Sequence, residues 1–165
     1  MTDRFYNMGL RGRKWIVAVA LVAGLLGFSK QGLAAGGGDY TATPTTPPAI
    51  AKAQKAINKN DFAAAYAILS QNENQYKNNA DLYNLMGFSA RKLGRYDDSM
   101  AYYTKALDIN PKHKGALEYM GELHLTLKQP EKAKALLARL EQICTFGCEE
   151  KRELQEAIAK WEAEN

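Results

Sequence analysis

The chain has 165 residues, of which 46% are apolar and 24% are charged, and it contains only two cysteines. This length suits one domain with a tail. The composition excludes a small disulfide-built protein, a collagen-like chain and a fully disordered chain. The net charge of +4 lies in residues 1–34, where five basic residues outnumber a single acid, so the rest of the chain is neutral overall. A neutral body argues against a nucleic-acid partner, because such binding depends on basic side chains that displace counterions from phosphates.

Residues 1–34 have the pattern of an export signal. Basic residues precede an apolar run from Trp15 to Phe28, which is shorter than the roughly 20 residues that a membrane-spanning helix needs. The run fits the apolar core of a signal peptide. The small residues Gly32 and Ala34 lead us to place cleavage after Ala34, and we expect a periplasmic or secreted protein. An uncleaved segment that anchors the chain to a membrane, as in a tethered envelope-assembly subunit, is an alternative.

Residues 35–48 are dominated by glycine, threonine and proline. Such a composition offers almost nothing to bury and has no helical period. We therefore predict a disordered linker between the signal and the body.

The body repeats with a period of 34 residues. Small residues recur in two sets of positions, and bulky or turn residues in two more: Ala53, Gly87 and Gly121; Ala65, Ser99 and Ala133; Leu69, Tyr103 and Leu137; Phe62, Tyr96 and Pro130. Each unit contains two helical patterns with a break between them. The pattern predicts three pairs of antiparallel helices at about 49–79, 80–113 and 114–145. The small residues of the first two sets are expected where paired helices approach most closely, because larger side chains would push the helices apart.

This pattern resembles the tetratricopeptide repeat. The clearest unit carries Tyr83, Met86, Gly87, Tyr96, Ser99, Tyr103, Ala106 and Pro111. The first unit departs from the family at Lys52 and Asn72, and the third departs at Leu140 and Thr145. The resemblance, to a small bacterial secreted or periplasmic member of the family, implies an all-α, right-handed solenoid of about three helical hairpins.

Residues 146–165 follow the third unit and predict one more helix. Leu154, Ile158 and Trp161 share one face of it. We expect this helix to cap the apolar end of the last repeat, as solenoids generally require. A helix lying on a membrane surface is the alternative, but its acidic bias argues against binding to anionic lipids.

The resemblance implies a non-catalytic interaction module that binds a peptide or helix in a concave groove lined by the first helices. The residues expected to face this groove are Gln54, Asn84, Phe88, Arg91, Glu118 and Glu122. We expect Asn84 to pair with a peptide backbone, Phe88 to give an apolar contact and Arg91 to bind a carboxylate. Glu118 and Glu122 are expected to select a basic feature of the ligand.

The sequence contains no motif that supports catalysis, a metal site or a cofactor. We therefore expect no enzyme, no metal and no cofactor. The two histidines are interpreted as structural, with His113 in a turn between repeats and His124 as a packed ring.

Both cysteines lie in the short stretch from Cys144 to Cys148. Export to an oxidising compartment would favour a structural disulfide between them. A thiol–disulfide redox factor that uses this pair is the alternative function, and a metal site is a further alternative for these residues.

Overall fold

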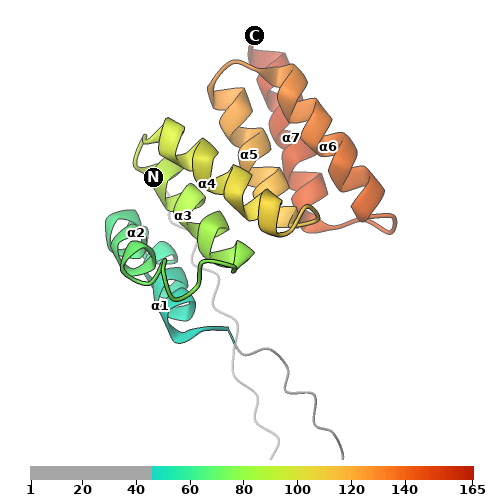
Figure 1. The fold of residues 1–165 in the computed structure, drawn as a ribbon. Coiled ribbons are helices and arrows are strands. Elements are labelled where there is room, and N and C mark those ends of the chain that lie inside the picture. The colour runs from blue at the N-terminus through green and yellow to red at the C-terminus, as the bar shows by residue number, and fades with distance from the viewer. Residues whose placement is uncertain (1–45) are drawn as a thin grey trace, which may run out of the picture. The chain divides into compact units, whose positions relative to one another are not determined.

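The computed structural model of the protein describes residues 46–165. The predicted export signal, its cleavage site and nearly all of the predicted linker lie outside the described residues. Within them the chain forms helices and no strand, which confirms the predicted all-α repeat fold (Figure 1). The helices are α1 (Pro48–Ile57), α2 (Phe62–Gln71), α3 (Ala80–Lys92), α4 (Tyr96–Ile109), α5 (Lys114–Thr126), α6 (Pro130–Ile143) and α7 (Glu149–Glu164).

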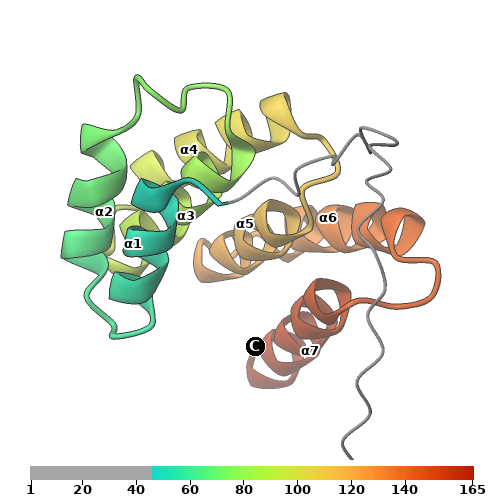
Figure 2. The same cartoon turned by 90° about the horizontal axis from the view of Figure 1, so that it is seen from below.

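The first six helices form three hairpins, and the seventh follows the last hairpin. The pairs α1/α2, α3/α4 and α5/α6 fall within the three predicted units. In Figure 2, α2, α4 and α6 lie on the outer side of α1, α3 and α5. The prediction of a linker up to residue 48 is one residue too long, because Pro48 already opens α1. Proline suits this first helical position, where its missing N–H has no intrahelical partner.

The turn inside each hairpin shows the 34-residue period in the backbone itself. Asn60, Gly94 and Lys128 are each 34 residues apart and have positive φ angles of 60°, 75° and 57°. Each is followed by a residue whose N–H donates to a carbonyl five positions earlier: Asp61 to Ala56, Arg95 to Ala90 and Gln129 to His124, at 2.9, 2.9 and 2.8 Å. These bonds satisfy carbonyls at the end of the first helix and require the left-handed conformation at the preceding residue.

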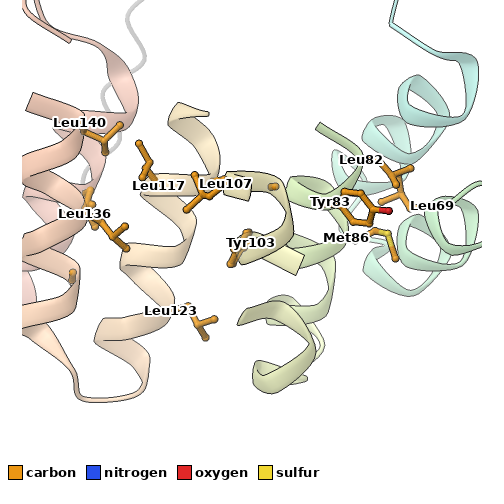
Figure 3. Close-up of a cluster of buried hydrophobic side chains, with 14 of the residues drawn as sticks. Leu69, Leu82, Tyr83, Met86, Tyr103, Leu107, Leu117, Leu123, Leu136 and Leu140 are labelled. Carbon is orange, nitrogen blue, oxygen red and sulfur yellow. The ribbon is translucent and has the colours of Figure 1, made fainter. Parts of the chain in front are cut away.

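The core is continuous through the repeats. It runs from Leu69 of α2 through Tyr103 of α4 to Leu140 of α6, all fully buried (Figure 3). The predicted packing residues Ala53, Ala65, Ser99 and Ala133 are also fully buried. The Ser99 hydroxyl donates to the Gly87 carbonyl at 2.8 Å and so joins α4 to α3.

The two packing glycines differ in their partners. A Cβ atom on Gly87 would lie 2.6 Å from the Tyr103 ring of α4, as expected for a contact within a hairpin. A Cβ atom on Gly121 would instead lie 2.6 Å from Leu154 of α7. The atoms nearest to Gly121 therefore belong to α7, which packs against α5.

The last helix packs against both α5 and α6. Leu154 and Ile158 are buried, and Trp161 packs against the core. An ion pair of 2.8 Å between Lys134 of α6 and Glu162 adds a polar contact at its edge. Helix α7 therefore caps the last repeat as predicted. Among the described helices, none combines the length and the apolarity that a bilayer-spanning segment needs.

Candidate binding groove

The first helix of each hairpin and α7 together line one hollow of about 230 Å³, which we call the groove. Its lining residues are Gln54 and Ile57 of α1; Asn84, Leu85 and Phe88 of α3; Gly115, Glu118 and Tyr119 of α5; and Glu149, Glu150 and Glu153 of α7. The groove therefore has apolar surface toward α1 and α3 and carboxyl groups toward α7.

The structure brings together four of the six predicted groove residues. Gln54, Asn84, Phe88 and Glu118 line the groove. Arg91 and Glu122 instead line a separate hollow that they share with residues of α7, Trp161 among them. The predicted set is therefore divided between two surfaces.

Arg91 and Glu122 bind each other. An Arg91 Nη2 atom lies 2.5 Å from Glu122 Oε2, and the Arg91 side chain is only 12% exposed. The guanidinium also lies 5.6 Å from the centroid of the Phe88 ring and 5.8 Å from that of Tyr119. The two charges thus compensate each other across neighbouring repeats, and the expected roles of Arg91 toward a ligand carboxylate and of Glu122 toward a basic ligand stay predictions.

Phe88 contributes to the fold as well as to the groove. Its ring centroid lies 4.9 Å from that of Tyr119 and 6.0 Å from that of Phe62. These contacts connect α3 to the repeats on either side. Phe88 is half-buried, so one part of the ring remains open to the groove.

Glu118 differs most from its predicted state. The residue is only 3% exposed, although it was expected to face the groove as a charge that selects a basic ligand. Burial, followed by the neighbouring carboxyl of Glu153 and the charges of Glu122 and Glu150, raises the pKa of Glu118 to about 9. Because α7 covers this part of α5, the carboxyl holds its proton at neutral pH.

Asn84 is buried beside the groove without full hydrogen bonding. The residue is 7% exposed, and its side-chain carbonyl oxygen Oδ1 has no hydrogen-bond partner among the described residues. Its Nδ2 atom would lie 3.2 Å from a Cβ on Gly115, so the absence of a side chain at 115 leaves room for Asn84. The expectation that Asn84 offers a polar group to a ligand is compatible with this position.

The acidic residues of α7 are groove residues that the sequence analysis missed. Only the capping role of this helix was predicted. The period of 34 contains the missing signal, because it relates Gly115 to Glu149 and Tyr119 to Glu153. Extending the repeat by half a unit would have placed these carboxylates beside the groove.

His113 joins two repeats at the edge of the groove. Its Nδ1 atom accepts a hydrogen bond of 3.1 Å from the Ala116 N–H and so caps α5. Its Nε2 atom donates to Asp81 of α3 at 3.0 Å, and this bond holds the pKa of Asp81 below its usual range. The turn position of His113 was predicted, but its bond to α3 was not. His124 is a buried ring, 3.1 Å from the Gln129 side chain.

Cys144 and Cys148 are joined as a disulfide with a Cα–Cα distance of 5.6 Å. Cys144 directly follows α6, and Cys148 directly precedes α7. Gly147 has a φ of 89° and allows the chain to reverse between them. The bridge therefore spans the whole connection between the last repeat and its cap. Over residues 46–165, no three His, Cys, Asp or Glu side chains gather closely enough to hold a metal ion.

Comparisons with known proteins agree with this architecture. A tetratricopeptide-repeat family model matches residues 90–143. No curated protein matches the chain.

Three solved structures illustrate the shared fold. The first tetratricopeptide domain of Spaghetti (RPAP3), bound to an HSP90 peptide, has a TM-score of 0.61 at 17% identity, over 70% of this chain and 93% of that chain. The type III secretion translocator chaperone SycD of Yersinia enterocolitica has a TM-score of 0.60 at 13% identity, over 68% and 85% of the two chains. A tetratricopeptide repeat protein from Parabacteroides merdae has a TM-score of 0.59 at 15% identity, over 70% and 45%. The repeat register, the helix pairing and the family match over residues 90–143 together show that this chain has the tetratricopeptide-repeat fold.

Proposed function

We propose that the protein works without catalysis, as an interaction module that holds a segment of a partner polypeptide in the groove. The observation that carries this proposal is the mixed lining of the groove. Phe88 and Tyr119 offer aromatic surface, and Asn84 offers an acceptor that none of residues 46–165 satisfies. Polypeptide segments present this same mixture of apolar side chains and hydrogen-bond donors. The bound peptide in the Spaghetti structure supports the view that the fold can hold such a ligand.

The proposal includes export of the protein. The pattern of residues 1–34 supports cleavage after Ala34 and a periplasmic or secreted location. Mass spectrometry of the protein from its host envelope tests this directly, and we expect a mature N-terminus at Ala35. Met8 is a second methionine ahead of the apolar run at which translation can start. An N-terminus at Met1 or Met8 would contradict cleavage and favour the tethered alternative.

Site-specific photo-crosslinking in the producing cells tests the groove as the contact surface. Gln54 is a suitable position, because its side chain is exposed and bonds only Asn58, one turn away. Ala101 is the matched control, since it is exposed on the outer helix α4. With benzoylphenylalanine at each position, we expect a discrete crosslinked polypeptide from position 54 and none from position 101.

Crosslinks of equal yield from both positions, or none from position 54, would contradict binding in the groove. Replacing Phe88 or Arg91 by alanine is a less suitable test of binding in the groove. Both side chains pack between repeats, so their removal would change stability together with binding.

A further inference from the structure

Acceptor groups from three helices line the groove together. We call the set Asn84, Glu118, Glu150 and Glu153 the acceptor cluster; α3, α5 and α7 supply its members. Among the described residues that line the groove, none is a lysine or an arginine. Arg152 lies 3.7 Å from Glu153, but it bonds Glu156 at 2.9 Å and points to solvent with 56% of its side chain exposed. The cluster therefore lacks a cation of its own inside the groove.

Asn84 gives independent evidence that the cluster binds a hydrogen-bond donor from a ligand. More than nine-tenths of this residue is buried, and its Oδ1 accepts no hydrogen bond from any residue that the structure describes. A buried acceptor left unpaired destabilises a fold by about 1–3 kcal/mol. A donor that enters the groove would satisfy Oδ1, and a ligand carboxylate would only add repulsion from the neighbouring glutamates.

We infer that the α7 end of the groove is a subsite for a lysine or arginine side chain of the partner polypeptide, an inference that rests on the proposed function of the groove. Ammonium and guanidinium groups carry only donors, three and five respectively, and so match a cluster that consists of acceptors once Glu118 has released its proton. Both groups can bond a carboxyl and the Asn84 carbonyl at the same time.

The rest of the groove fits the stem of such a side chain. Ile57, Leu85 and Phe88 give one wall an apolar surface. Lysine and arginine bury their methylene stems along apolar surface while the charged end seeks polar partners. A side chain that enters past α1 and α3 would thus place its charge against α5 and α7.

The proton on Glu118 gives the subsite a distinct signature. A bound cation favours the ionised carboxylate, so the pKa of Glu118, about 9 in the free protein, should fall when the subsite is filled. The proton then passes to solvent. Other titratable groups around Glu118 are Tyr119 and Glu122 of α5 and Glu150 and Glu153 of α7, with Arg91 of α3 held by Glu122. His113, Lys112 and Lys114 lie with Glu150 around an adjoining hollow.

Peptide libraries of fixed central residue test the charge preference. The mature protein, attached through its N-terminus, is offered acetylated and amidated nine-residue libraries with lysine, arginine, norleucine or glutamate at the centre. We expect the lysine and arginine libraries to be retained about tenfold more than the norleucine library, as charge-assisted hydrogen bonds would give. The glutamate library should be retained least.

Two double variants distinguish the effect of the subsite carboxyl groups on peptide retention from the effect of the protein's net charge. Glu118→Gln with Glu153→Gln should abolish the preference for a basic centre. Glu131→Gln with Glu141→Gln on α6 makes the same two substitutions at exposed positions, removes at least as much negative charge from the protein, and should leave the preference intact. Equal retention of basic and norleucine libraries by the wild-type protein would overturn the inference while leaving the proposed polypeptide groove in place.

A probe that mimics the side chain alone distinguishes failure of the subsite from failure of the proposed polypeptide groove. Butylammonium, the lysine side chain without a peptide, is titrated against the protein and followed by the NMR signals of the Asn84 side-chain amide and the Glu118 carboxyl, with butanol as the control. We expect both signals to shift with butylammonium only and the pKa of Glu118 to fall. Such shifts without retention of any library would support the subsite and contradict the proposed function. No shift with either probe, together with no basic preference, would overturn the subsite.

Discussion

Replacing Gly121 by alanine should affect stability with a sign that depends on the side chain at position 154. A Cβ on Gly121 would lie 2.6 and 2.7 Å from the two terminal carbons of Leu154, where 3.4–4 Å is ordinary contact. Leu154 is fully buried between α7 and the last repeat, so it has little room to move. Overpacking of this kind costs about 1–3 kcal/mol, and the better helix propensity of alanine returns about 1 kcal/mol. We therefore expect Gly121→Ala to lower the free energy of unfolding by up to about 2 kcal/mol.

The sign should reverse when Leu154 is shortened. Leu154→Ala alone removes a buried side chain and should cost about 2–5 kcal/mol. It also removes the three atoms nearest to the added methyl group, which all belong to Leu154. In that background Gly121→Ala should stabilise the protein by about 1 kcal/mol, the propensity difference alone. The coupling between the two changes should then exceed about 1 kcal/mol.

Urea unfolding of the four proteins in the cycle measures the coupling. Hydrogen exchange over residues 149–164 reports whether α7 itself loosens in Gly121→Ala. Ala135→Gly, at an exposed position of α6, measures the propensity difference without a contact. If Gly121→Ala changed stability equally with leucine and with alanine at position 154, the contact between α5 and α7 would not exist as described.

Three further predictions concern the turns, the buried carboxyl and the disulfide. Lys128→Gly should raise the free energy of unfolding by about 1 kcal/mol in a urea titration, because lysine at a φ of 57° carries strain that glycine does not. Glu118→Gln should leave stability unchanged near pH 4.5 and raise it by at least about 1 kcal/mol at pH 8. The sign follows from the raised pKa: the folded protein holds a proton that the unfolded chain has lost, so wild-type stability falls as the pH rises from 4.5 toward about 9. Cys144→Ser with Cys148→Ser should lower the free energy of unfolding by about 2 kcal/mol. Amide exchange should become faster in residues 149–164 than in α3. Two free thiols in protein purified without reductant would contradict the pairing and favour the redox alternative.

The period of 34 made most of the fold predictable from the sequence. Close approach of paired helices demands small residues, so Ala65, Ser99 and Ala133 could be placed in the core without a structure, and all three are fully buried. Phe62, Tyr96 and Pro130 likewise fall at the first residues of α2, α4 and α6. Local propensity and packing agree along these segments, which is why the helix pairs follow from a single sequence.

The groove was less predictable, because its properties depend on contacts between repeats. The helical period assigns Arg91 and Glu122 to a face of α3 and of α5, but it does not say that neighbouring first helices bring them within 2.5 Å of each other. The period likewise assigns Glu118 to the groove face, but it does not say that the residue is buried. Its burial follows from the position of α7, a helix outside the three predicted repeats.

The charge of the groove follows from the way in which α7 is held. The apolar face of α7, with Leu154 and Ile158, packs against α5 and α6. The neighbouring face that completes the groove is polar. A cap that served only to cover apolar surface would work as well with neutral side chains there. The chain instead places Glu150 and Glu153 against a buried Glu118, at a cost in stability that a neutral cap would avoid. Carboxyl groups that repel one another and have strongly shifted pKa values cluster at functional sites. If the proposed groove binds a polypeptide, the last helix is thus also the element that sets which side chains it accepts.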